Sequence, residues 1–354
     1  MKVLAVNSSA RVGRESKTER MLLPLVEGMR DAGAEVEMVN LAREDVAYCI
    51  GCFTCWTKTP GTCIHKDDMT REIYPRYIAS DMCILATPLY HYTVNACMKT
   101  FIERTLPMAL PFMVHQDGVT RHPMRHQARP TVVLSVAGFP DMNVFDQLSA
   151  YVKFLFHDKL MAEIYRPAAE SMEGGAEKAV VEDILEATFQ GGRELVASGS
   201  ISADTMARIQ QPVMDIETMV PLANIFWQTC IDEGVTPKTF EKKEMVPRPD
   251  SIETFLMVMK MAFNPEKAKD ITARIQFFFS GEVAGPCYLQ LDAGKIEVFE
   301  HTSDAPDLTI ETPFDVWMDI LTQKADGEKL FMEQKYQVSG DMGLLMRFAE
   351  FFGR

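Results

Sequence analysis

The sequence predicts two classes of fold in one chain of 354 residues: an α/β unit with a doubly wound parallel sheet, then an α+β unit. Up to about residue 197, short apolar runs alternate with helical patterns, which is typical of buried parallel strands covered by helices. After about residue 250, apolar and polar residues alternate as in half-buried strands. Two of these strands flank Asp292-Ala293-Gly294-Lys295, a sequence that favours a hairpin turn.

Five strands are predicted in the first half of the chain. The first is the apolar run Val3–Val6, and the others cover residues 35–41, 82–86, 131–136 and 162–165. Helical patterns cover residues 17–32, 68–79, 94–105, 144–156 and 177–197, while residues 107–129 are predicted to be a long loop. Five parallel strands with intervening helices indicate a flavodoxin-like doubly wound sheet.

The second half is predicted to begin with helices and to end as an α+β unit. Residues 201–247 have a helical pattern, and two prolines with clustered charge suggest a linker at 242–249. Strands follow at 271–279, 288–291, 296–299 and 308–311. A helix is then expected with Thr312 as its N-cap and Pro313 at its first position. The predicted division is therefore 1–199, a helical connector 200–249, and 250–354.

Composition limits the classes of partner. Apolar residues make up 47% of the chain, as in a globular protein with a large core, and the net charge of −14 argues against nucleic acid or anionic membranes as partners. No run approaches the roughly 18 apolar residues of a membrane span, and the N-terminus resembles a strand rather than a signal peptide. A cytoplasmic protein is expected, where clustered cysteines more often serve metal or redox chemistry than disulfides.

Four of the eight cysteines lie within fifteen residues, at Cys49, Cys52, Cys55 and Cys63. Two-residue intervals with a fourth cysteine nearby are how a short loop wraps a cubane iron–sulfur cluster, whereas zinc sites usually present two separated pairs. The spacing also leaves open a packed loop with free thiols or a reactive redox pair. The other four cysteines lie in apolar stretches and are expected to be small buried hydrophobes.

The turn after the first strand is rich in hydroxyl groups and leads directly into a helix. Ser9, Ser16 and Thr18 can donate hydrogen bonds there, and Arg11 can neutralise charge. A helix N-terminus favours phosphate, and the absence of a Gly-x-Gly-x-x-Gly or Walker motif points to a single phosphate such as that of FMN. Alternatively, Ser16 and Glu19 form a capping box; both interpretations can hold together.

Two further segments follow strands that end at the same edge of the predicted sheet, where ligands of doubly wound sheets bind. These segments would meet an isoalloxazine ring, and they comprise Thr87, Pro88, Leu89 and Tyr90 after the third strand and Ala137 and Gly138 after the fourth. The alternative is an ordinary strand-to-helix turn in which Asn95 starts the next helix. The basic segment with Arg121, His122, Arg125 and His126 is more often a solvated loop or subunit contact than a site for NADPH phosphates.

Roughly residues 1–195 resemble the family of NADPH-dependent FMN reductases and iron–sulfur flavoproteins. The motifs are Ser8-Ser9-Ala10-Arg11, the cysteine loop followed by Lys66-Asp67-Asp68-Met69, Ala86 to Tyr90, and Lys99 with Glu103-Arg104. The resemblance implies that Ser9, Arg11, Ser16 and Thr18 hold the FMN phosphate and that the six residues of the two strand-end segments line the ring. It also implies that the four clustered cysteines ligate a [4Fe–4S] cluster, that NAD(P)H is a co-substrate, and that the protein is a homo-oligomer, a dimer or tetramer.

About residues 255–354 resemble the sterol carrier protein type two domain. The motifs are Gly294 to Val298, Pro306 to Ile310, Trp317, Gly327 and Val338 to Asp341. The resemblance implies a five-stranded sheet with helices around an apolar tunnel for lipids or acyl chains. Phe255, Met257, Met259, Met261 and Phe263 would suit such a tunnel, and equally an ordinary core.

Three functions are compatible with these features. The first is an FMN-dependent oxidoreductase that passes electrons from NAD(P)H or a reduced carrier to a small-molecule or protein acceptor, with an apolar acceptor held by the C-terminal domain as one version. The flavin would perform the chemistry, so no acid–base pair is required. The second is an electron carrier with FMN and a cluster, and the third is a lipid-binding protein with the first domain as scaffold.

Overall fold

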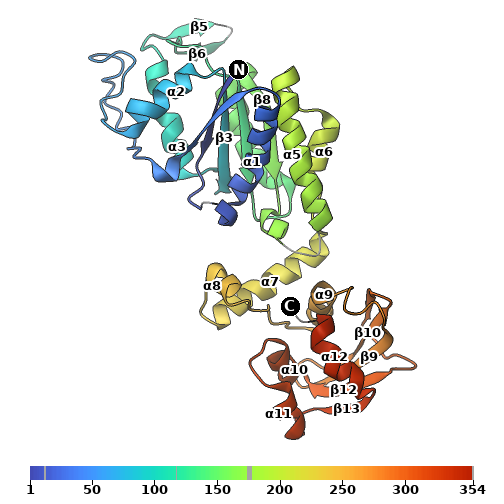
Figure 1. Ribbon diagram of the computed structural model, residues 1–354. Coiled ribbons are helices and arrows are strands. Elements are labelled where there is room, and N and C mark those ends of the chain that lie inside the picture. Colours follow the sequence, from blue (N-terminus) through green and yellow to red (C-terminus); the bar gives the residue numbers. More distant parts are fainter. Residues whose placement is uncertain (12, 117, 174–177, 353–354) are drawn as a thin grey trace. The chain divides into compact units, whose positions relative to one another are not determined.

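The computed structural model describes residues 1–354 except 12, 117, 174–177 and 353–354. The chain divides into two compact units, Met1–Met214 and Asp215–Arg354 (Figure 1). The predicted three-part division stays a prediction. The predicted connector, residues 200–249, contributes the helix of residues 203–210 to the first unit and the helices of residues 216–242 to the second.

The first unit contains a parallel sheet with the strand order β2-β1-β3-β7-β8, which confirms the predicted doubly wound sheet. Its strands are β1 (Lys2–Asn7), β2 (Glu35–Asn40), β3 (Met82–Tyr90), β7 (Thr131–Val136) and β8 (Leu160–Arg166). Successive residues of β1 point to opposite sides: Val3 and Ala5 join one apolar cluster, Leu4 and Val6 another. Both faces of the sheet are thus buried.

Helices cover the two faces of this sheet. On one face lie α1 (Lys17–Asp31) and α5 (Lys178–Ser198), with α6 (Ala203–Gln210) packed on α5. The other face is covered by α2 (Tyr74–Ala79), α3 (Ala96–Glu103) and α4 (Asp146–Phe156). The predicted start of the last helix, residue 177, lies outside the described residues. Helices α1 and α5 cross closely because a Cβ at Gly28 would lie 1.9 Å from the Phe189 carbonyl oxygen, and one at Gly192 2.1 Å from that of Leu25.

The third strand is longer than predicted. Instead of ending near Ala86, β3 pairs with β7 as far as Pro88 and then with the short β4 (Thr93–Val94) in a hairpin. Strand β1 pairs only as far as Ala86, so beyond that residue β3 has a free side, where proline is tolerated. His91 and Tyr92 make the turn with φ values of 46° and 64°, which is uncommon for residues other than glycine.

The segment predicted as a loop over residues 107–129 contains a small hairpin, β5 (Val114–Gln116) and β6 (Val119–Arg121). All described residues of both strands are exposed, so burial imposes no apolar alternation that the sequence could display. This explains why the prediction missed the hairpin.

The second unit has a five-stranded sheet in the order β11-β10-β9-β12-β13, in which only β9 and β12 run parallel. The strands are β9 (Thr272–Ser280), β10 (Gly285–Asp292), β11 (Lys295–Phe299), β12 (Leu308–Pro313) and β13 (Gln337–Gly340). Around them are α7 (Ile216–Asp232), α8 (Pro237–Lys242), α9 (Ile252–Ala262), α10 (Phe314–Leu321), α11 (Gly327–Met332) and α12 (Met342–Phe352).

Two local predictions in the second unit have different outcomes. The hairpin over Asp292–Lys295 is confirmed, with Ala293 and Gly294 at φ values of 46° and 83°. The predicted N-cap at Thr312 is wrong, because Thr312 and Pro313 still belong to β12 and α10 begins at Phe314 without a side-chain cap.

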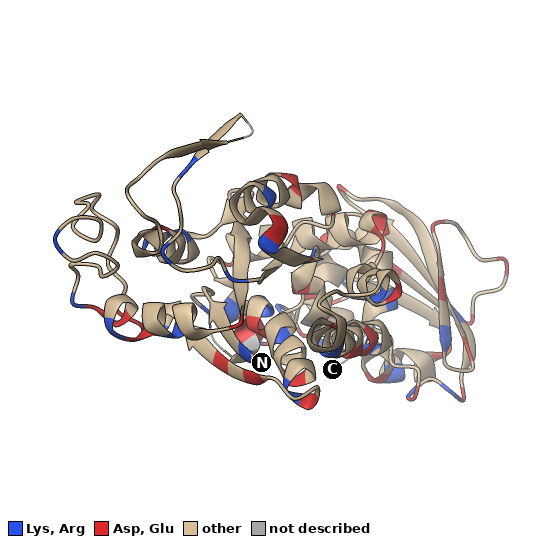
Figure 2. Cartoon of the chain, turned by 90° about the horizontal axis from the view of Figure 1, so that it is seen from above, with Lys and Arg blue, Asp and Glu red and all other residues tan. Residues whose placement is uncertain are grey.

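The core of the second unit is strongly aromatic: the ring of Phe277 lies 5.2 Å from each of the rings of Phe255 and Trp317. Basic and acidic residues are interspersed along the chain (Figure 2). Within the described residues, no helix is long and apolar enough to cross a membrane.

Candidate functional site

The strands of the first sheet are parallel, so their carboxyl ends meet at one edge, called here the carboxyl edge. The Ser8 backbone N–H and hydroxyl both donate to the Ala86 carbonyl, at 2.9 and 3.2 Å, and join the ends of β1 and β3. The Ala137 N–H donates to the Arg166 carbonyl at 3.0 Å and joins the ends of β7 and β8. Because β3 also pairs with β7 as far as Pro88 and Val136, the strands from which the predicted flavin-binding segments continue lie side by side.

The hydroxyl-rich turn lies at the N-terminus of α1. The Ser16 hydroxyl caps the helix by accepting from the Glu19 N–H at 3.1 Å, and it donates to the Ser9 hydroxyl at 2.9 Å. The Glu19 carboxylate accepts from the Gly13 N–H at 2.7 Å instead of from the Ser16 N–H, so the alternative of a Ser16–Glu19 capping box is realised only in part. Ser9, Ser16 and Thr18 are all buried.

Two cations lie beside this turn, and both pair with one carboxylate. Arg11, which is exposed, lies 3.4 Å from Glu170, and the ammonium of the buried Lys17 lies 3.3 Å from the same carboxylate. A phosphate at the N-terminus of α1 would therefore meet two positive charges as well as the helix dipole. Lys17 was not among the predicted phosphate-binding residues. Its place in the first turn of the helix, directly before Thr18, could have indicated a cation near the phosphate.

The four predicted ring-binding residues on β3 differ in exposure. Thr87 and Pro88 are buried, Leu89 is half-buried and Tyr90 is 52% exposed. The Thr87 hydroxyl accepts from the Asn95 N–H at 3.2 Å, so this hydroxyl is engaged inside the protein. A planar ligand at this edge would meet Tyr90, Leu89 and the backbone rather than the Thr87 side chain.

Asn95 links three elements of the carboxyl edge. Its side-chain amide donates to the Ser8 carbonyl at 2.7 Å, and its side-chain oxygen caps α3 by accepting from the Met98 N–H at 3.0 Å. The alternative that Asn95 starts the helix is thus realised. The structure adds the bond to Ser8, which sequence spacing could not reveal.

The predicted ring residues after β7 also lie at the carboxyl edge. Ala137 is buried, and its carbonyl accepts from the Ala169 N–H at 2.9 Å. Gly138 is exposed, and a Cβ placed on it would meet nothing within 4 Å, so a ligand can approach its backbone. Nearby, the Ser135 hydroxyl is buried without a hydrogen-bond partner among the described residues.

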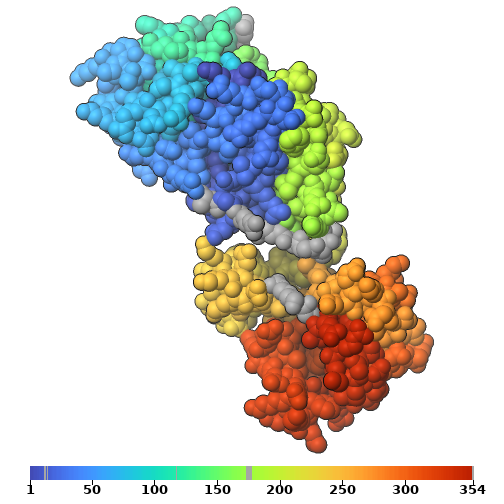
Figure 3. All heavy atoms as spheres, in the orientation of Figure 1, coloured from blue at the N-terminus to red at the C-terminus, as the bar shows by residue number. Residues whose placement is uncertain are grey.

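The second candidate site is the cysteine pocket, which is lined by all four clustered cysteines together with His65, Glu103, Arg104 and several apolar residues. Cys55 is buried, Cys49 and Cys63 are half-buried and Cys52 is exposed. Burial raises the pKa of Cys55, whereas hydrogen bonds with Thr54 lower the pKa of Cys52. Figure 3 shows the loop that carries these cysteines on the surface of the first unit.

A buried ion pair supports this pocket. Arg104 donates to both carboxylate oxygens of Asp67, at 2.5 and 3.0 Å, and both side chains are almost completely buried. Asp67 also accepts from the Ala47 and Thr70 N–H groups, at 3.0 Å each. Burial alone would raise the pKa of Asp67, but the hydrogen bonds from Arg104, Ala47 and Thr70 hold it well below its usual range.

The basic segment packs against the cysteine loop of the same chain. The His122 ring lies 4.9 Å from that of Trp56, and a Cβ at Gly61 would lie 3.0 Å from the Arg125 side chain. The Trp56 indole donates to the Leu106 carbonyl at 3.4 Å. The basic segment was predicted to be a solvated loop or a subunit contact, and its packing against the cysteine loop was not predicted.

The four thiols of the cysteine pocket are the residues that could hold an iron–sulfur cluster. In the described ranges, no group of three or more His, Cys, Asp or Glu residues is arranged to hold one metal ion. A cubane takes one cysteine on each iron, so its ligands surround a volume instead of converging on a point. The Arg104 Nε and His65 Nε2 atoms are buried there without partners in the part of the chain described, as expected beside a site for an anionic group.

Comparisons with known proteins agree with both resemblances. Residues 1–155 match the family model of NADPH-dependent FMN reductase, and residues 255–353 match that of the SCP-2 sterol transfer family. An iron-sulfur flavoprotein of Archaeoglobus fulgidus is 38% identical over 107 residues, 30% of this chain and 46% of that protein. An FMN-dependent NADH:quinone oxidoreductase 2 of Pseudomonas aeruginosa is 24% identical over 125 residues, 33% of this chain and 61% of that protein. The chain thus spans about half the length of the curated relatives it matches.

Solved structures were also found for each part. An NAD(P)H:quinone oxidoreductase from Methanothermobacter marburgensis has a TM-score of 0.41 and 17% identity, over 55% of this chain and 96% of that one. Sterol carrier protein 2 from Yarrowia lipolytica has a TM-score of 0.24 and 18% identity, over 28% of this chain and 91% of that one. The two resemblances stated from the sequence are confirmed by the family models.

Proposed function

We propose that this protein is an FMN-dependent oxidoreductase that takes electrons from NAD(P)H or a reduced carrier and passes them to an acceptor. The main support is the carboxyl edge, where a capped helix N-terminus, two cations and an open stretch of backbone lie next to one another. The match of residues 1–155 to the NADPH-dependent FMN reductase family names the cofactor.

In this proposal each predicted residue has a role. Ser9, Ser16 and Thr18 lie around the phosphate with Arg11, and Lys17 is added as a second cation. Tyr90, Leu89 and the backbone of Thr87, Pro88, Ala137 and Gly138 lie along the ring. FMN would supply the electron transfer itself, and the chain would bind it, orient it and shield one side from water.

The second candidate function is that of an iron–sulfur flavoprotein, in which the chain exchanges electrons with a redox protein and has no small organic substrate. The cysteine pocket favours this function, because its four thiols and two unpartnered buried nitrogen atoms fit a [4Fe–4S] cluster. Such a cluster requires a reducing compartment, so a cytoplasmic location belongs to this proposal.

A third proposal concerns the second unit, which would bind a lipid, an acyl chain or an apolar acceptor. It is supported by the match of residues 255–353 to the SCP-2 sterol transfer family. Displacement of a fluorescent fatty acid from the full chain tests this ligand directly. Assembly as a dimer or tetramer is proposed by family resemblance and can be measured by sedimentation.

The decisive experiment is an anaerobic ultraviolet–visible spectrum of the purified chain, with iron and sulfide assays on the same sample. Flavin bands with a broad shoulder and about four irons per chain support the iron–sulfur flavoprotein. Flavin bands alone, with rapid oxidation of NAD(P)H in the presence of a quinone, support the reductase without a cluster. A chain that neither contains nor binds FMN would overturn both redox proposals and leave lipid binding.

A further inference from the structure

Arg104 is a buried cation that lies next to the clustered cysteines as well as to its ion-pair partner. Its side chain is 1% exposed, and it lines the pocket that all four clustered cysteines share. Burying a charge is costly unless it is paired and hydrogen-bonded, and Asp67 supplies the pairing. Two well-packed apolar side chains often stabilise a protein as much as a buried ion pair does. We therefore looked for a role of the Asp67–Arg104 pair beside the thiols other than stability.

The two terminal nitrogens of Arg104 are fully engaged by other groups. Besides Asp67, Nη1 donates to the Ala47 carbonyl at 2.6 Å and Nη2 to the Thr70 hydroxyl at 2.8 Å. Four hydrogen bonds to fixed partners hold the guanidinium plane in one orientation. The remaining donor, Nε, is buried and has no partner among the residues described.

Cys63 is the clustered cysteine that shares two pockets with this guanidinium. It lines the cysteine pocket together with Arg104, and both residues also line a neighbouring pocket with Thr70 and Tyr74. An arginine with a spare donor therefore lines the same two pockets as a sulfur that the second candidate function assigns to a cluster.

We propose that Arg104 is a positioning residue for the cluster: when Cys63 ligates iron, the Nε–H group of Arg104 donates a hydrogen bond to its sulfur. This inference rests on the proposed iron–sulfur function of the cysteine pocket. Reduction adds one negative charge to a cluster that is already anionic, and a hydrogen bond to a ligand sulfur stabilises the reduced form more. Arg104 thus raises the reduction potential of the cluster, and Asp67 sets the orientation of the donor.

Two variants remove this donor in different ways. Arg104→Lys keeps a positive charge opposite Asp67 but has no N–H group at the position of Nε. The double variant Arg104→Gln with Asp67→Asn replaces the buried ion pair by two neutral amides, and joint removal of both charges is often nearly neutral for stability. Arg129→Gln is the matched control, because Arg129 also has a buried Nε without a partner among the described residues but does not line the cysteine pocket.

The measurement is the midpoint potential of the cluster in the reconstituted holoprotein, followed by electron paramagnetic resonance, with iron content checked on each sample. We expect both Arg104 variants to shift the potential downward by about 59 mV or more, which is a tenfold change in equilibrium constant for one electron. Arg129→Gln should leave it unchanged. Loaded Arg104 variants with the wild-type potential would overturn the inference alone. A wild-type chain that holds FMN but no iron would overturn the cluster, and the inference with it.

Discussion

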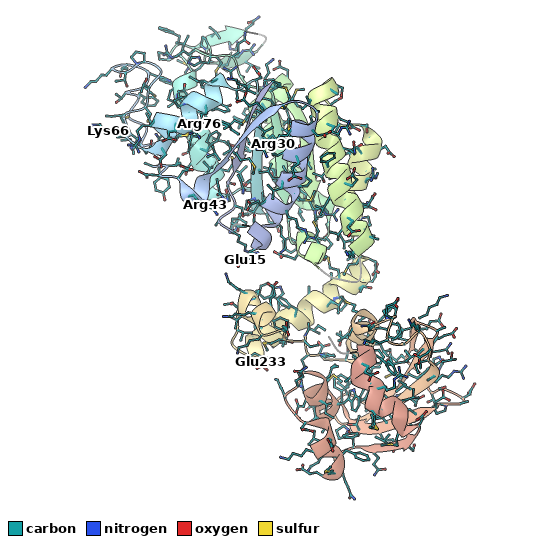
Figure 4. All side chains as sticks on the ribbon, in the orientation of Figure 1. Glu15, Arg30, Arg43, Lys66, Arg76 and Glu233 are labelled. Carbon is teal, nitrogen blue, oxygen red and sulfur yellow. The ribbon has the colours of Figure 1, made fainter. Side chains whose placement is uncertain are left out.

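The carboxyl edge and the cysteine pocket are both parts of the first unit, but they are supported in different ways. In Figure 4, Glu15 marks the carboxyl edge and Lys66 the end of the cysteine loop, at separate places on the unit. The edge is held by backbone and side-chain hydrogen bonds spread over the ends of β1, β3, β7 and β8. The pocket belongs to a loop without regular strands, and the pair Asp67–Arg104 joins it to the rest of the unit.

The two sites should therefore respond differently to substitutions. At the carboxyl edge, where many hydrogen bonds share the support, the loss of one should lower the stability of the site only by the contribution of that bond. Where one buried pair carries the support, losing one partner leaves a buried charge without compensation. Substitutions at the two sites should therefore differ in the size of their effects.

Replacing Cys55 should have the largest effect. Cys55→Ser removes the buried thiol of the pocket, and a cubane needs four thiolates, so we expect iron content to fall from about four per chain to near zero while FMN remains. Iron and sulfide assays after anaerobic reconstitution measure this. Cys97→Ser is the control, since Cys97 does not line the pocket and is exposed, which corrects the prediction that all four other cysteines are buried. Undiminished iron in Cys55→Ser would remove this cysteine from the ligand set.

Asp67→Asn should loosen the cysteine loop strongly. It leaves the buried Arg104 without its counter-charge, and we expect the free energy of local opening around the loop to fall by about 3–5 kcal/mol at pH 7. Hydrogen exchange resolved by peptide measures this opening. Equal exchange in the loop of the wild type and the variant would contradict the claim that this pair carries the support.

The same variant tests the pH dependence. The pKa of Asp67 is held below its ordinary value in the folded protein, so its contribution is complete above the unfolded pKa of about 3.9. It is lost progressively as the pH falls below that value toward the lower, folded pKa. The difference between wild type and Asp67→Asn should therefore be nearly the same at pH 7 and pH 5 and should shrink progressively below about pH 4. Shrinkage already at pH 5 would place the folded pKa above its ordinary value.

Asn95→Ala should weaken the carboxyl edge to a smaller degree. It removes the α3 cap and the hydrogen bond to the Ser8 carbonyl, which together should lower stability by about 2–3 kcal/mol. Thermal unfolding measures the stability of the fold, and the release of FMN during the same experiment reports on the site. Thr236→Ala, which removes the exposed N-cap of α8 in the second unit, is the control and should cost about 1 kcal/mol without loss of flavin.

Glu170→Gln should have the smallest effect, and in the opposite direction. Its carboxylate pairs with Arg11 and Lys17 at the proposed phosphate site, so its removal takes an acidic group that competes with the FMN phosphate away from both cations. Because the side chains of Glu170 and Arg11 are both more than half exposed, the effect is about 0–1 kcal/mol and the affinity for FMN should rise no more than about fivefold. Flavin fluorescence titration measures the change. Weaker binding would mean that Glu170 orients the two cations rather than competing with the phosphate.

Several features could be predicted because local sequence carries their cause. The parallel α/β class follows from short apolar runs separated by helices, and Ser16 was placed correctly as a helix cap because its hydroxyl acts on the next turn. The hairpin at Asp292–Lys295 likewise needs only its own residues. The small hairpin at residues 114–121 was missed because its described residues are exposed and burial leaves no pattern there.

The α/β and α+β classes, both family resemblances and the spacing of the four cysteines can be read from the sequence alone. The tertiary structure is needed to find which groups meet: Lys17 with Glu170, Asn95 with Ser8, and Arg104 with Asp67 beside Cys63. Helix and strand periods arise from neighbouring residues and are visible along the chain. Contacts between residues 37 to 153 positions apart arise instead from the packing of the sheet and its loops, and no local pattern encodes them.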